Sequence, residues 1–78
     1  TYDPPNLADG AGATTTVTVT GAAVGDFAQA SFGGDTAGIT ITAWVSAANT
    51  VSVRFQNESG GALDIGSSTL RARVIKAV

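Results

Sequence analysis

The chain has 78 residues, six of them acidic and four basic, a net charge of −2, and neither cysteine nor histidine. This composition excludes disulfides and histidine-based nucleophilic triads, and it disfavours a zinc or copper site. The four bases make no stripe suited to nucleic acid, and no apolar run is long enough to cross a membrane as a helix. We expect one small soluble domain that buries only about 60% of its extended-chain surface, so oligomerisation is the remaining source of extra stability.

The first segment, residues 1–12, contains both prolines and ends in an Asp/Gly cluster. Proline fixes φ and removes a hydrogen-bond donor, and such clusters form turns, so the segment predicts an extended N-terminal arm. A single β domain is expected over residues 13–78. The arm is either a disordered leader or a segment that lies on a neighbouring subunit, with Tyr2 and Leu7 as its anchors.

Short segments in which apolar and polar residues alternate follow the arm, and Gly, Asn or Ser clusters separate them. The expected strands cover residues 14–20, 27–32, 39–46, 50–57, 63–65 and 69–76. No stretch has a sustained helical period. The pattern predicts an all-β fold, a small antiparallel β-sandwich or barrel of about six strands.

The alternation also assigns the faces of most strands. In residues 50–57 it places Val51, Val53 and Phe55 inward, and the loop with Asn49 predicts a hairpin with the preceding strand. Trp44 falls on the otherwise polar face of that strand. It is either a core or subunit-interface residue or part of a ligand platform such as a glycan site. For residues 27–32 the pattern leaves open which face is buried.

Three arginines, Arg54, Arg71 and Arg73, are predicted to point outward from strands that could be neighbours. Like charges side by side need carboxylate partners, which an adjacent subunit could supply. The residues expected to contact another copy or another protein are Tyr2, Leu7, Trp44, Arg54, Arg71 and Arg73.

Nearly all the acidic residues fall in turns, where a carboxylate normally caps the backbone. We therefore predict no catalytic, cofactor-binding or metal-binding residue, although loops of this kind leave a calcium site open. Lys76 and Thr1 are poor candidates for a serine–lysine dyad and an N-terminal nucleophile. The triplet that begins at Asn57 matches the glycosylation sequon.

Residues 43–57 (AWVSAANTVSVRFQN) and 63–74 (LDIGSSTLRARV), together with residues 21–27 (GAAVGDF), resemble a module of small structural proteins of tailed bacteriophages. The resemblance implies a virion protein, and no family catalytic residues come with it. It points first to a capsid decoration (cement) protein on the capsid surface, a homotrimer that contacts the major capsid protein. The alternative is a receptor- or glycan-binding module of a tail fibre or head spike, and a very small hydrolase is a third hypothesis.

Overall fold

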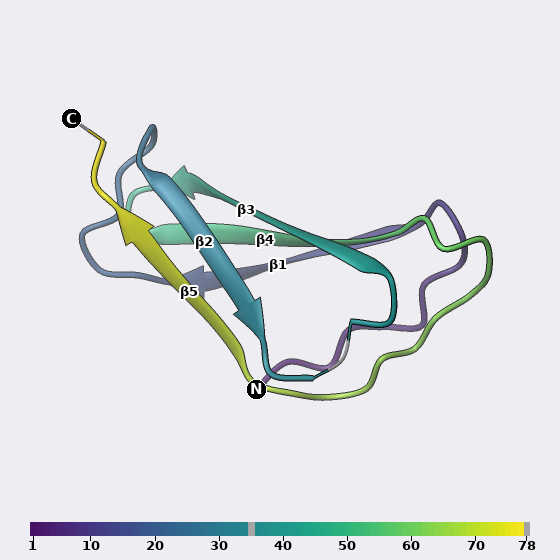
Figure 1. The fold of residues 1–78 in the computed structure, drawn as a ribbon. Helices are drawn as coiled ribbons and strands as arrows, with labels where there is room; N and C mark the ends of the chain where they lie inside the picture. Colours follow the sequence, from purple (N-terminus) through teal and green to yellow (C-terminus); the bar gives the residue numbers. More distant parts are fainter. Residues whose placement is uncertain (35, 78) are drawn as a thin grey trace.

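The computed structural model describes residues 1–34 and 36–77, which form five β-strands and no helix. The strands are β1 (Gly12–Thr18), β2 (Phe27–Phe32), β3 (Ile39–Ala47), β4 (Thr50–Asn57) and β5 (Leu70–Ile75). They make two antiparallel sheets, one of order β1-β4-β3 and one that pairs β2 with β5 (Figure 1). The prediction of an all-β fold is confirmed. Within the described residues there is no helix able to span a membrane.

The three-stranded sheet is built on the β3–β4 hairpin, as the alternation predicted. Asn49 turns the chain with φ of 60°, in the left-handed region that asparagine tolerates. Its side-chain Oδ1 accepts a hydrogen bond of 2.8 Å from the amide of Gly21, and its own amide donates to the carbonyl of Ala22 at 2.8 Å. The hairpin turn therefore also fixes the chain where it leaves β1.

The two-stranded sheet crosses the face of the other sheet, as Figure 1 shows. Ala30 of β2 lies opposite Ala72 of β5, and β2 approaches β3 of the larger sheet. Apolar residues from the facing sides of both sheets pack on one core. The two sheets do not join into a closed barrel over the described residues.

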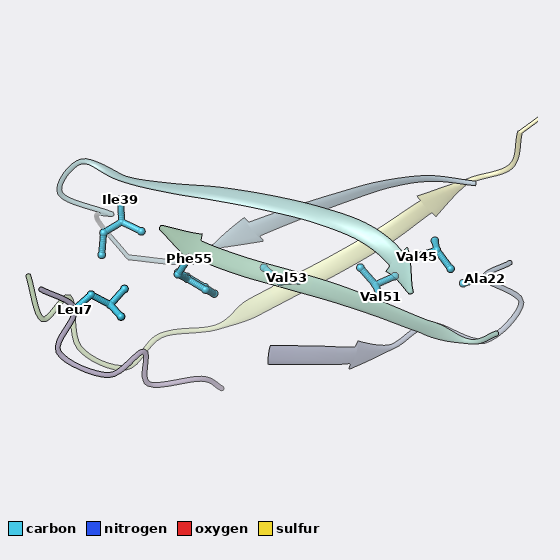
Figure 2. Packing of buried hydrophobic residues seen from close by; sticks show 7 residues of the cluster. All are labelled: Leu7, Ala22, Ile39, Val45, Val51, Val53 and Phe55. Atoms are coloured by element: carbon cyan, nitrogen blue, oxygen red, sulfur yellow. The ribbon is translucent and has the colours of Figure 1, made fainter. Parts of the chain in front are cut away.

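The centre of the core lies on β4, whose side chains Val51, Val53 and Phe55 are completely buried (Figure 2). The aromatic ring of Phe55 lies 5.5 Å from that of Phe32, edge to face, and 5.3 Å from that of Tyr2. β4 is the middle strand of its sheet, so β1 and β3 flank it on either side. Side chains of the two-stranded sheet, such as Phe32, cover its inward side. The inward assignment of these three residues is confirmed.

The N-terminal segment lies along its own chain. Tyr2 and Ser68 exchange backbone hydrogen bonds of 2.8 and 3.0 Å, and Leu7 and Leu63 exchange two of 2.8 Å. The side chain of Leu7 is only 4% exposed and belongs to the core. Leu7 therefore packs within its own chain, at the end of the core where Ile39 also lies (Figure 2).

Two strand assignments differ from the sequence-based expectation by more than one residue at an end. The first strand was expected over residues 14–20, but it begins at Gly12 and ends at Thr18. Residues 63–65 form a single bridge at Leu63 and no strand, which leaves five strands where about six were predicted. Glycines flank this segment on both sides, and it finds a partner only at Leu7, so pairing does not extend.

Candidate interaction surface

The outward side of the two-stranded sheet carries large exposed side chains. We call this surface the β2–β5 outer face; its members are Phe27, Gln29, Ser31, Arg71, Arg73 and Ile75. All six are exposed, whereas the residues that alternate with them are half-buried against the core. The alternation of strands with period two therefore sorts this sheet into an apolar inner side and a mixed outer side.

Cross-strand pairing arranges the β2–β5 outer face in three rows. Phe27 lies opposite Ile75, and the two residues are 64% and 47% exposed. In the next row Arg73 donates a 2.6 Å hydrogen bond from Nε to Oε1 of Gln29. Arg71 lies in the third row, opposite Ser31, and its guanidinium makes no hydrogen bond or ion pair with another described residue. An aromatic and aliphatic pair beside two arginines is the composition that binding hot spots favour.

An ion pair fixes the end of this sheet where the apolar row lies. The Nζ of Lys76 donates to Oδ2 of Asp26 at 2.5 Å and to the carbonyl of Gly21 at 3.0 Å. The carboxylate of Asp26 also accepts from the backbone amides of Ala23 and Ala77, each at 3.1 Å. The hydrogen bond from Lys76, followed by that from Ala77, lowers the pKa of Asp26 below its usual value. The turn before β2 is thus tied to the end of β5.

The outward side of the three-stranded sheet has a different character. Trp44 is 44% exposed on it, opposite the small residue Ser52, and is surrounded mainly by threonines and serines. Ser52 is itself buried and shares a 2.7 Å hydrogen bond with the hydroxyl of Ser46. Trp44 therefore does not lie in the core of its own chain, and a subunit interface and a ligand platform remain as its two alternatives.

Arg54 lies on the same side as Trp44 and is held by its neighbours. Its guanidinium donates to Oγ1 of Thr14 at 3.1 Å and to Oε1 of Gln56 at 2.9 Å. A Cβ at Gly12 would lie 2.5 Å from its Nη2, so a larger residue at Gly12 would displace the end of this arginine side chain. Arg54 belongs to β4 and Arg71 and Arg73 to β5, in separate sheets, so the expectation of neighbouring strands is wrong.

A groove of about 700 Å³ lies between β3 and the two-stranded sheet. Its lining residues are Ala28, Gln29, Ala30, Ser31, Ile41, Ala43, Arg71, Ala72 and Arg73. The five apolar ones lie at the margin of the core and are half-buried. Four of them are alanines, whose small side chains leave the space between the strands unfilled.

The described residues also bear on the sequon and on a possible calcium site. Asn57 is completely buried and its side chain is held by four hydrogen bonds, so the sequon is not an accessible acceptor in the folded chain. Across the part of the chain that the structure describes, no three acidic side chains converge on a point where a metal ion could be held. Asp35, one of the acidic turn residues, lies outside the described residues.

Sequence reasoning placed Arg71 and Arg73 outward but missed the apolar row beside them. Phe27 and Phe32 stand at opposite ends of β2 and on opposite faces, so aromatic content could not choose the buried side. The choice is made by pairing with β5, which sets Phe32 against Leu70 on the inner side and Phe27 against Ile75 on the outer side. The apolar inward residues of β5, which are Leu70, Ala72 and Val74, were the sequence signal that could have shown which side of β2 is buried.

Comparisons with protein-family models, with curated proteins and with solved structures find no match for this chain.

Proposed function

We propose that this chain is a non-enzymatic structural protein of a phage virion, a homotrimeric capsid decoration protein that stabilises the head. In this proposal the two sheets are the layers of a small β-sandwich. The observation that carries it is the β2–β5 outer face, where Phe27 and Ile75 stand exposed beside Arg71 and Arg73. The likeness of residues 21–27, 43–57 and 63–74 to phage structural modules supports the same conclusion.

The chemistry of this face suits a protein partner. Exposed large apolar side chains bury hydrophobic surface on contact, and each arginine can form a bidentate pair with a carboxylate. Arg71 has its guanidinium available for such a pair. The partner proposed is an acidic surface of the major capsid protein. Repetition around a symmetric shell adds avidity, so each single contact can be weak.

The experiment adds purified protein to phage heads that lack it and measures retention after sedimentation. Wild-type protein is expected to bind in multiples of three per site. Arg71→Ala with Arg73→Ala should lower the retained amount at least about tenfold, because both carboxylate pairs are lost. Ala62→Glu with Ser67→Glu changes the net charge equally at exposed positions of the segment between β4 and β5 and should bind normally. A wild-type chain that stays monomeric and never binds heads would refute the proposal.

The second candidate is a glycan-binding module of a tail fibre or head spike. The observation that favours it is the exposed Trp44 among hydroxyl side chains, since an aromatic ring can stack on a sugar. A glycan array separates the two functions. Specific binding that Trp44→Ala abolishes, with no retention on heads, would select the glycan function.

A further inference from the structure

We propose that the trimer is a ring in which Trp44 of each copy inserts into the β2–β3–β5 groove of the next copy. This inference rests on the self-association in the proposed function and names the contact that produces it. The occupant of the groove is thus a second copy of this chain. Two features carry the inference: an isolated aromatic side chain and a groove lined by alanines.

The inserted group is Trp44, the only tryptophan in the chain. Its flanking positions on the same side of β3 are Thr42 and Ser46, and the residue opposite on β4 is Ser52. All are smaller than an indole, so the ring stands above its surroundings and remains 44% exposed. A large aromatic side chain with exposed area is the group that gains most from burial in a partner.

The receiving groove has the matching properties. It offers about 700 Å³, more than one indole needs, and alanines from three strands line it. Ile41 and Ala43 of β3 form one wall, with Ala30 and Ala72 on the other. Arg71 and Arg73 also contribute to the lining of the groove.

The sides of the molecule on which Trp44 and the groove lie determine the symmetry of the assembly. Ile41 and Ala43 point to the inner side of β3, whereas Trp44 points to the outer side, because neighbouring residues of a strand alternate. A chain therefore cannot fill its own groove, and a two-fold dimer would need both features in one patch. Contact between opposite sides of the molecule is heterologous and repeats head to tail. In the proposed trimer, three copies would close it into a ring.

A mixing experiment tests this geometry directly. Trp44→Ala removes the inserted group and leaves the groove, and Ala72→Leu fills the groove and leaves the inserted group. Each variant alone should be monomeric, with the dissociation constant of self-association raised at least about tenfold. An equimolar mixture can make one intact contact, so it should give a one-to-one dimer and no trimer. Val24→Ala removes another exposed apolar side chain and should leave the trimer intact.

The wild-type chain offers a readout that needs no substitution. On dilution through the dissociation range, the emission of Trp44 should shift to longer wavelength and quenching by acrylamide should increase, because the indole enters water. The ring would be overturned if Trp44→Ala formed trimers at the same concentration as the wild-type chain. It would also be overturned if a wild-type trimer dissociated without a change in the emission of Trp44. Either result would leave the proposed function intact. A wild-type chain that is monomeric throughout would overturn both.

Discussion

The side-chain amide of Asn57 donates a 2.8 Å hydrogen bond to the backbone carbonyl of Leu7, across 50 positions of the chain. The same amide donates to the carbonyl of Gly61 at 2.8 Å. The Oδ1 of Asn57 accepts from the backbone amide and the hydroxyl of Ser59. A fully buried polar side chain is thus fully satisfied, and it joins the N-terminal segment to the turn after β4.

Asn57→Asp should lower the free energy of unfolding at neutral pH by about 3 kcal/mol or more. A carboxylate cannot donate to the carbonyls of Leu7 and Gly61, and it places an unpaired charge in a buried site. Urea unfolding followed by far-UV circular dichroism measures the loss. Asn6→Asp makes the same chemical change at an exposed position and should alter stability by less than about 0.5 kcal/mol. Equal effects would show that Asn57 does not hold the segment.

Two phenylalanines lie in opposite environments, Phe55 in the core and Phe27 on the β2–β5 outer face. Phe55→Ala should cost about 3 to 5 kcal/mol of unfolding free energy, because the ring is completely buried between Tyr2 and Phe32. Phe27→Ala removes the same group from an exposed position and should cost less than about 1 kcal/mol. Thermal and urea denaturation of the two variants give the comparison. A cost below about 1 kcal/mol for Phe55→Ala would mean that the strand faces are reversed.

Leu7→Ala should lower the unfolding free energy by about 2 to 5 kcal/mol, since Leu7 is a core residue. Removal of residues 1–10 should also lower the melting temperature of the single chain, because Tyr2 and Leu7 contact their own chain. Val24→Ala is the control, because that side chain is 72% exposed. An unchanged melting temperature for Leu7→Ala, with assembly lost, would show instead that Leu7 contacts a neighbouring subunit.

Stability should fall in acid in a way that depends on Asp26. Its pKa is lower in the folded chain than in the unfolded one, so unfolding at low pH takes up a proton. The contribution is complete above the unfolded pKa of about 3.9 and is lost as the pH falls through the lower folded value. Asp26→Asn should flatten this part of the profile, measured by urea unfolding between pH 2 and 6. Asn6→Ala changes an exposed residue without removing a titratable group and should retain the wild-type slope.

Local pattern was enough to predict the hairpin of β3 and β4. Its apolar and polar residues alternate without a break over most of both strands, and Asn49 can adopt the left-handed turn. The outward direction of Arg71 and Arg73 followed from the same rule. These features depend on residues close together in the chain, so no tertiary information was needed.

The remaining features depend on partners far apart in the sequence. Tyr2 pairs with Ser68 and Leu7 with Leu63, and no sequence pattern around these residues predicts either bridge. The exposed pair of Phe27 and Ile75 required the register between β2 and β5. The groove arises from alanines on three strands, each unremarkable in its own segment. Such long-range pairings decide which side chains are left outside, and these are the ones available to a partner.

Sedimentation equilibrium of the wild-type chain tests most directly the claim that this protein functions by assembly. The account predicts a species of three times the 7.7 kDa chain mass, in equilibrium with single chains at low concentration. A mass of one chain at every accessible concentration would contradict it.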